Sequence, residues 1–396
     1  MSRLSRPAAA PTRYSPAMPP GAPLPRLPRA ARAIAQQVLL YGPQPRNEIA
    51  RRLELSAGSV TRLTRPLIDA GILVEQDALR GVSHGRPTRP LDVAADAHEF
   101  VGVKLTADHL YLVITDLRSR VVAERSVPLV GREPAEVADL IVATMRKLNG
   151  RPTLRAIGVT VGGRTRDRST VVSAPFLGWT EVPLGAMLTA AAGLPAVVDN
   201  DVVALTESLH WFGAGRGLDR FAVLTIGAGI GYALVVHDRI VRSPDGDVGI
   251  LGYHQVGSAG RLSLTGSGRS VASLLTSSSV CSAAGDGLGR TVGYEEVLDL
   301  AGAGDVTCRA VVDEAAFTLG RLIQTVATVA MTERIILSGE GVRLATVGQA
   351  AMADGIAVGR PISAAPITLD VHPIEFSEWA RGAAVIAIQA FVLGPD

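Results

Sequence analysis

The sequence has few cysteines, no secretory start and no long uninterrupted apolar run. Of its 396 residues two are cysteine, Cys281 and Cys308, and neither belongs to a CxxC pair. We therefore expect no disulfide framework and a cytoplasmic location. The nearest approach to a membrane span, residues 383–393, is too short and contains Gln389, so we expect no membrane partner.

Lysine is also nearly absent, since Lys104 and Lys147 stand beside 37 arginines. With abundant alanine and glycine, this imbalance is typical of a GC-rich coding bias, and the arginine count alone says little about nucleic acid. The distribution of charge says more. Residues 1–92 contain 14 arginines and six acidic residues, whereas the remainder contains 25 basic and 31 acidic residues. A cationic front on a mildly acidic body is the asymmetry expected of a DNA-binding head.

Three segments differ in composition. Residues 1–28 hold eight of the 24 prolines and almost no periodic apolar pattern, so we expect this tail to be disordered. Residues 29–93 have helical periodicity and form the predicted DNA-binding domain. From residue 94 the pattern changes to strands, and residues 94–396 predict a larger α/β body with ample core.

Two helices and a tight connection form the centre of the DNA-binding segment. Apolar residues at three- and four-residue spacing predict a helix over 46–53. A second helix is expected over 57–70, with the Ser56 hydroxyl as its N-cap and Gly71 at its left-handed end. A further helix over 29–40 is expected to pack under this pair.

Two short β segments follow, at 72–75 and 90–93, on either side of a polar loop with a basic tip. Helix, turn, helix and wing together predict a winged helix-turn-helix that reads double-stranded operator DNA, whereas two amphipathic helices alone would also fit an ordinary helical hairpin. Side chains of the second helix are expected on bases and phosphates of the major groove, and the wing arginine in the minor groove. The residues expected to contact DNA are Arg51, Ser56, Ser59, Thr61, Arg62, Arg65 and Arg86.

The body opens with three closely spaced β runs, at 100–105, 110–115 and 121–127. Their spacing predicts an antiparallel meander at the start of a mixed sheet. A helix is expected over 134–148, followed by a strand over 156–161.

Three short motifs stand at the ends of predicted buried strands. Asp199-Asn200-Asp201 begins a helix, and Gly227-Ala228-Gly229-Ile230-Gly231 forms a glycine loop after a strand at 221–225. Ser338-Gly339-Glu340-Gly341 follows a strand at 334–337. None of these motifs is specific alone.

Their order is informative. A winged helix followed by VDNDVVALTES, LTIGAGIG, IILSGEGV and WARGAA closely resembles the ROK family (repressors, open reading frames and kinases), from about residue 29 to the C-terminus. The resemblance is to its repressor branch, which includes xylose and N-acetylglucosamine repressors. It implies a two-lobed, actin-like and hexokinase-like domain that closes over a sugar, with nucleotide phosphates held by two β-turns.

The first of those turns departs from the family pattern. A family kinase carries Asp-x-Gly-Gly-Thr where this chain reads Lys104-Leu105-Thr106-Ala107-Asp108. Both glycines are missing, a cation replaces the first carboxylate, and Asp108 brings negative charge to a place meant for an anion. In the second turn Gly227, Gly229 and Gly231 remain, which we interpret as structural glycines. We therefore expect no phosphoryl transfer, no catalytic residue and no cofactor.

The sugar contacts that the resemblance implies are kept in part. Asn200 and Asp201 match a family pair in which the Asp is the general base, although an Asp at a helix start is also an ordinary cap. The family's Gly-Glu-x-Gly-His motif reads Gly249-Ile250-Leu251-Gly252-Tyr253, with His254 out of register on an expected strand. The next sugar-contacting Glu of the family is Val271. The expected effector contacts are Asn200, Asp201, Gly229 and Tyr253.

A structural zinc site follows in the family, held by three cysteines and the motif histidine. Residues 262–271 of this chain stand at that place and contain no cysteine. Since thiolate and imidazole ligands hold zinc, we expect no metal.

The sequence therefore predicts a homodimeric, or higher homo-oligomeric, repressor of carbohydrate uptake and metabolism genes. Its effector domain is expected to be catalytically inactive and to bind a sugar or sugar phosphate. Two alternatives stay open: a sugar kinase with an accessory DNA-binding head, and a ligand-independent DNA-binding regulator with a decayed sugar pocket.

Overall fold

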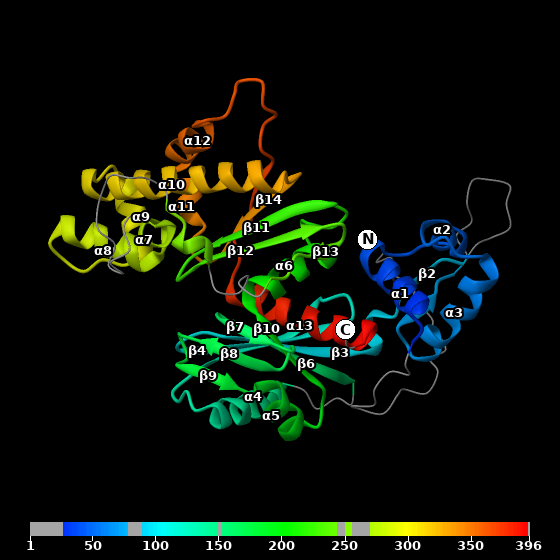
Figure 1. The fold of residues 1–396 in the computed structure, drawn as a ribbon. Coiled ribbons are helices and arrows are strands. Elements are labelled where there is room, and N and C mark those ends of the chain that lie inside the picture. The colour runs from blue at the N-terminus through cyan, green and yellow to red at the C-terminus, as the bar shows by residue number, and fades with distance from the viewer. Residues whose placement is uncertain (1–26, 78–88, 149–152, 244–249, 256–269, 395–396) are drawn as a thin grey trace, which may run out of the picture.

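The computed structural model describes residues 27–77, 89–148, 153–243, 250–255 and 270–394. It shows a mixed α/β chain in which two five-stranded sheets form the centres of two lobes (Figure 1). A smaller, mainly helical head lies beside the first lobe. Nearly all of the expected N-terminal tail lies outside the described residues.

Three helices and a two-stranded ribbon form the head, which comprises the described residues between 27 and 93. The helices are α1 (Arg29–Tyr41), α2 (Arg46–Arg52) and α3 (Ala57–Asp69), and the ribbon pairs β1 (Leu73–Glu75) antiparallel with β2 (Leu91–Val93). These bounds confirm the helices and β segments that apolar spacing predicts. The loop with Arg86 lies outside the described residues.

Helix α3 begins where the sequence places its cap. Ser56 Oγ accepts a hydrogen bond from the backbone N–H of Ser59 at 3.1 Å, which satisfies a donor that the first helical turn leaves free. At the other end Gly71 has a φ of 69°, in the left-handed region that glycine enters without steric cost. Both ends of α3 are therefore fixed, and its outward side chains keep a defined direction.

The first lobe is built on a sheet with the strand order β10-β6-β3-β4-β5. Its strands are β3 (Glu99–Leu105), β4 (His109–Asp116), β5 (Val121–Pro128), β6 (Leu154–Val161) and β10 (Ala196–Asn200). The first three form the predicted antiparallel meander, whereas β6 runs parallel to β3 and β10 parallel to β6. Helices α4 (Pro134–Leu148) and α5 (Leu184–Ala192) pack on one face, and a short η1 (Ala95–Ala97) leads from the head into β3.

A small antiparallel sheet, which the sequence did not predict, lies beside this lobe. It consists of β7 (Arg164–Arg166), β8 (Thr170–Ala174) and β9 (Trp179–Val182). Its strands have three to five residues, too few for an alternating pattern to be distinguished from loop sequence.

The second lobe has the strand order β13-β12-β11-β14-β15 and a helical cap. The strands are β11 (Arg220–Ile226), β12 (Ile230–Val236), β13 (Arg239–Ile240), β14 (Arg334–Ser338) and β15 (Leu369–Val371). The helices are α7 (Val271–Leu275), α8 (Ser277–Leu288), α9 (Tyr294–Gly302), α10 (Val306–Ala330), α11 (Arg343–Val347) and α12 (Gln349–Ala357). Helix α6 (Asp201–Phe212) follows β10 and connects the two lobes.

The strand expected around His254 is wrong. Residues Ile250–Tyr253 form η3, a single 3-10 turn that packs against α7 and β12. Strand β13 pairs with only Val235 and Val236 of β12, whereas η3 packs near Ile230 at the other end of that strand. The described residues around His254 make no ladder with the sheet, and Gln255 forms only an isolated bridge with Ser270.

The C-terminal helix α13 (Phe376–Leu393) lies directly on the first sheet because two strands present glycine to it. A Cβ on Gly102 would stand 2.0 Å from the backbone oxygen of Ala380, and one on Gly158 would stand 1.8 Å from that of Ala383. Helix α13 is long and apolar enough by composition to cross a membrane, but 61% of that window is buried in the protein. Such burial is typical of a core helix.

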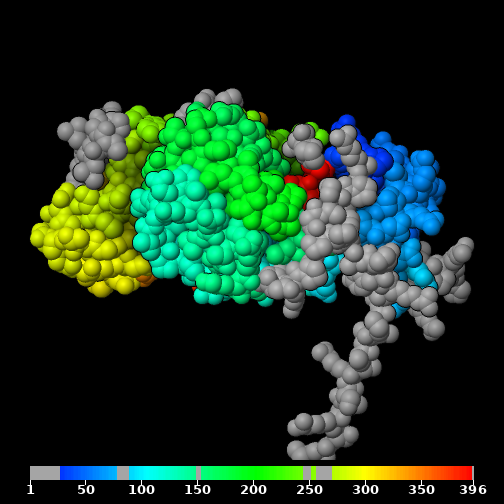
Figure 2. Space-filling view, turned by 90° about the horizontal axis from the view of Figure 1, so that it is seen from below, coloured from blue at the N-terminus to red at the C-terminus, as the bar shows by residue number. Residues whose placement is uncertain are grey.

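The head shares one hydrophobic core with the body. Ile34 and Leu67 of the head belong to the same buried cluster as Phe100 of β3 and as Ala384 and Ile388 of α13. Figure 2 shows α13 (red) emerging beside the head (blue) and the first lobe. The head is therefore seated on α13, and a shift of that helix changes the support on which the head rests.

His98 lies at the joint between head and body. Its Nε2 bonds the backbone oxygen of Ala70 at the end of α3 at 2.8 Å, and its Nδ1 accepts from Arg155 Nε at 2.9 Å. The neutral ring with hydrogen on Nε2 satisfies both contacts. Burial, with a smaller contribution from the positive charge of Arg155, lowers the pKa of His98 from 6.5 to about 4, although the bond to Ala70 acts in the opposite direction.

Because of His98, the free energy of unfolding is expected to decrease as the pH is lowered. Because the pKa of His98 is lower in the folded than in the unfolded state, its contribution is complete above pH 6.5 and is lost as the pH falls towards 4. At pH 5 the expected loss is about 2 kcal/mol. Urea unfolding at pH 7.5 and pH 5 measures it, with the neutral variant His98→Gln as comparison. If both proteins lose the same free energy of unfolding, His98 is not the cause.

Candidate functional site

A cavity of about 1150 Å³ lies between the two lobes. Its wall includes the turn after β3, the start of α6, the glycine loop after β11 and the first turn of α13. Its volume is sufficient for a small sugar-sized ligand with room to spare. Because both lobes line it, a bound molecule would contact both at once.

A largely buried ion pair in this cavity joins Lys104 and Asp201. Lys104 Nζ, at the end of β3, donates to Asp201 Oδ2, at the start of α6, and the two side chains are only 8% and 14% exposed. The ammonium also lies 5.1 Å from the ring centre of Trp379 on α13. The carboxylate that the resemblance assigns as a general base therefore has a cation of the same chain beside it.

Asn200 lines the cavity but uses its side chain to hold the fold. Its Oδ1 accepts from the backbone N–H groups of Val202 and Val203 at 2.8 and 3.2 Å, as the N-cap of α6. Its Nδ2 donates to the backbone oxygen of Gly163 at 2.9 Å. One donor hydrogen and the second lone pair of the oxygen are what this amide has left for a ligand.

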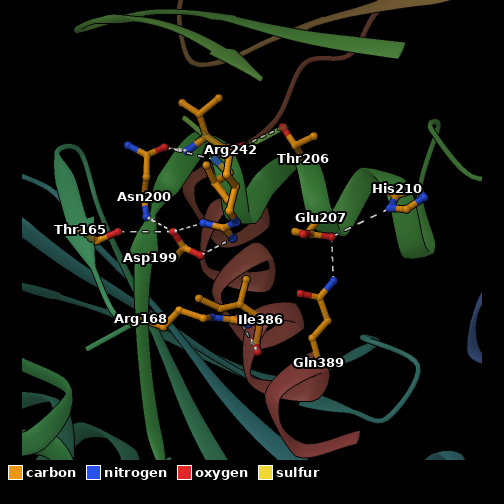
Figure 3. Close-up of polar contacts among 12 residues, drawn as sticks. Thr165, Arg168, Asp199, Asn200, Thr206, Glu207, His210, Arg242, Ile386 and Gln389 are labelled. Carbon is orange, nitrogen blue, oxygen red and sulfur yellow. Dashed lines mark hydrogen bonds and ion pairs between the residues drawn. The ribbon is translucent and has the colours of Figure 1, made fainter. Parts of the chain in front are cut away.

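Asp199, the first residue of the Asp199-Asn200-Asp201 motif, connects the lobes, a role that the motif alone does not indicate. Its side chain is 1% exposed, and its carboxylate accepts from Arg242 at 2.8 and 3.3 Å (Figure 3). Arg242 follows β13 of the second lobe, whereas Asp199 belongs to β10 of the first. A buried carboxylate requires such a partner, so this pair holds the lobes together next to Asn200.

A carboxylate stands at each of the two turns that line the cavity. In the first, Thr106 Oγ1 donates to Asp108 at 3.0 Å, which lowers the pKa of that exposed carboxyl, and His109 lies 3.1 Å away. In the second, Glu340 accepts from the backbone N–H of Ala228 at 2.7 Å. Sequence patterns pointed to Asp108 but not to Glu340, because the two turns that Glu340 joins are 112 residues apart.

The two remaining expected effector contacts also border the cavity. Tyr253 lies on η3 and is 66% exposed, and Gly229 has open space where a side chain would begin. Residues 262–269, most of the stretch where the zinc motif of the family would stand, lie outside the described part of the chain. Among the residues that are described, no three His, Cys, Asp or Glu side chains gather as a metal site would require.

The expected DNA-contacting residues gather on the head. Helix α3 lies on the side of the head that faces away from the lobes (Figure 1). Arg51, Arg62 and Arg65 are exposed, and no described acidic side chain pairs with them. Ser56 and Ser59 bond each other at 2.9 Å, and Thr61 Oγ1 donates to the backbone oxygen of Ala57. The arginines are thus the side chains with the most unused donors.

Comparison with known proteins adds a family and a set of relatives. A model of the ROK family matches residues 100–357. The "Putative xylose repressor" of Caldicellulosiruptor sp. is 26% identical over 56% of this chain and 57% of its own length. The "DNA-binding transcriptional repressor Mlc" of Escherichia coli is 24% identical over 58% and 59%. The chain thus spans a little under three fifths of the length of these two relatives. "Transcriptional regulator Mb0495" of Mycobacterium bovis is 27% identical over 78% of this chain and 74% of its own length.

Solved structures agree on the fold. A ROK family transcriptional regulator described as a homologue of the E. coli MLC protein superposes with a TM-score of 0.79 over 92% of this chain and 97% of that one, at 20% identity. A ROK family glucokinase from Streptomyces griseus superposes with a TM-score of 0.63 over 74% of this chain and 99% of that one, also at 20% identity. The superposition on the glucokinase leaves about a quarter of this chain unmatched.

Proposed function

The chain belongs to the ROK family, and from that premise we propose that it is a sequence-specific DNA-binding repressor of carbohydrate genes. The head at 29–93 acts as a winged helix-turn-helix, and residues 94–396 act as the effector and dimerisation domain, in the cytoplasm. The observation that carries this proposal is the outward face of α3, where Arg62 and Arg65 have no acidic partner among the described residues. Relatives named as repressors support it.

A homodimer fits the geometry of DNA recognition. One winged helix makes few contacts, and two half-sites about 34–36 Å apart along the duplex match a protein with two-fold symmetry. Arg62, Ser59 and Thr61 then read bases, while Arg51 and Arg65 hold phosphates.

We propose that the effector domain binds a ligand but does not catalyse phosphoryl transfer. Phosphoryl transfer to a sugar needs a carboxylate free to accept a proton, and Lys104 holds Asp201 in a buried ion pair. The same turn lacks the glycines that would let its backbone approach phosphates. ATP turnover with any hexose would overturn this part of the proposal.

Helix α13 gives the cavity a direct path to the head. Phe376 and Trp379, in its first turns, line the cavity, while Ala387 and Ile388, near its end, pack in the core that the head shares. A ligand that changes how far the lobes close would therefore shift α13 and the position of the head that packs on it. In a dimer, this shift would change the spacing of the two heads. A coupling of about 1–3 kcal/mol is enough for a switch.

The test begins with genome-wide recovery of bound DNA. The sugars handled by neighbouring genes are then added to the protein on its recovered operator, and DNA release is measured by fluorescence anisotropy. We expect one sugar to change the affinity, and Asp201→Ala to weaken that response. An undiminished response in Asp201→Ala would remove Asp201 from the effector site, and no binding to any recovered duplex at low salt would refute the function.

One observation favours a second candidate, a regulator that needs no ligand. Asn200 and Asp201 are both engaged by other groups of the chain, so the polar groups that the family uses for sugar are already occupied. If no sugar changes either the melting temperature or the DNA affinity, this second candidate replaces the first.

A further inference from the structure

The glycine loop after β11 is filled by a side chain of the same protein. Glu340 reaches across from the loop after β14, and its Oε1 accepts from the N–H of Ala228 at 2.7 Å. Backbone N–H groups in a tight glycine-rich turn form a natural site for an oxyanion. Here a carboxylate of the chain occupies that site.

The fit between loop and carboxylate is close. A Cβ on Gly227 would stand 2.1 Å from Glu340 Cδ, so only glycine leaves room for the carboxylate. The loop that carries Glu340 is tied in place: Gly341 N–H donates to the backbone oxygen of Ile226 at 2.8 Å, and Tyr294 donates to that of Gly341 at 2.8 Å. The fold therefore holds the backbone on either side of Glu340 next to the turn, and the exposed carboxylate reaches the turn from there.

Among the described residues, no neighbour cancels the charge of Glu340. No described arginine, lysine or histidine lies within ion-pair distance of it, and the lysine of the cavity is committed to Asp201. Asp108 brings a second negative charge to the same cavity. A phosphate at the Gly227–Gly229 turn would meet an occupied N–H group and two carboxylates, which oppose it by competition and repulsion. The arginine among the described lining residues, Arg164, lies on β7 and not on this turn.

We propose that Glu340 is an internal oxyanion that closes the Gly227–Gly229 turn and makes the cavity selective for uncharged ligands over phosphorylated ones. The proposal rests on the proposed function in one respect, that the cavity is where a ligand binds. It narrows the ligand from a sugar or sugar phosphate to a neutral sugar or polyol. Glu340 is then a specificity-determining residue.

Removal of the carboxylate should reopen the turn. The probe is inorganic pyrophosphate, titrated into the full chain by calorimetry at low salt, with no DNA present. We expect no detectable binding to the native protein at millimolar concentration and at least about tenfold tighter binding to Glu340→Ala. Glu340→Gln, which keeps the shape and an acceptor but not the charge, should gain less. Asp354→Ala, which removes one exposed charge from α12 of the same lobe, controls for net charge and should gain nothing.

The outcomes separate cleanly. Pyrophosphate binding by the native protein as tight as by Glu340→Ala, or no gain in either Glu340 variant while both remain folded by circular dichroism, overturns the proposal. An equal gain in Asp354→Ala assigns the effect to overall charge and overturns it too. Since the titration contains no DNA, the pyrophosphate result can be interpreted even if the protein is found not to bind DNA.

Discussion

Replacement of Arg62 and Arg65 by alanine is expected to lower the affinity of the protein for its operator by about 100-fold or more. Both arginines are exposed on α3, and neither has an acidic partner among the described side chains. Removal of an arginine that binds a base or phosphate costs about 1–3 kcal/mol, and each arginine occurs twice in a dimer. Two arginines thus suffice for the expected change.

Anisotropy titrations between 50 and 200 mM salt measure this effect. The slope of log affinity against log salt should fall by about one for each phosphate that the variant no longer neutralises. The matched control is Arg125→Ala with Arg239→Ala, which removes the same charge from exposed strands of the body. Equal decreases in affinity for the two double variants would mean that overall charge, and not α3, binds the duplex.

Replacement of Lys104 by methionine is expected to destabilise the protein by about 3–5 kcal/mol. The change leaves the Asp201 carboxylate buried without a counter-ion, and removal of one partner of a buried pair costs more than removal of both. The cation beside the ring of Trp379 is removed as well. The double variant Lys104→Met with Asp201→Asn should therefore recover most of the stability.

Urea unfolding at pH 7.5 gives the comparison. Lys147→Met is the matched control, because Lys147 is exposed in the last turn of α4 and is the one other lysine of the chain. We expect it to change stability by less than about 0.5 kcal/mol. If Lys104→Met and Lys147→Met unfold at the same urea concentration, the pair with Asp201 contributes nothing and the cavity is more hydrated than its burial indicates.

Local sequence patterns predicted much of the fold. The Ser56 cap, the meander of β3 to β5 and the helix Pro134–Leu148 all depend on residues close together in the chain, where spacing and capping act directly. The strand β7 was missed because three residues are too few to show the two-residue alternation by which a strand is recognised. The error at η3 has another cause, since strand formation depends on pairing with a neighbouring strand, and the sequence does not reveal whether that pairing forms.

The candidate site was predicted as separate positions and not as pairs. Lys104 was noticed as a missing carboxylate and Asp201 as a retained base, yet their meeting across 97 residues depends on how α6 follows β10 beside β3. Glu340 stood in a noted motif but received no role, because an acidic residue in a glycine-rich loop is ordinary until the opposite loop is placed beside it. Comparison of single positions with a family pattern cannot show that one departure compensates another.

The core that Ile34, Leu67 and Ile388 share has a consequence for engineering. In a chimera that joins residues 1–93 of this chain to the effector domain of a relative, the head would pack on the C-terminal helix of that relative. The side chains of that helix would not match the head. The module to transplant is discontinuous: it consists of the first 93 residues together with the last eighteen-residue helix. New pairings of operator and inducer in this scaffold would have to exchange both ends of the polypeptide together.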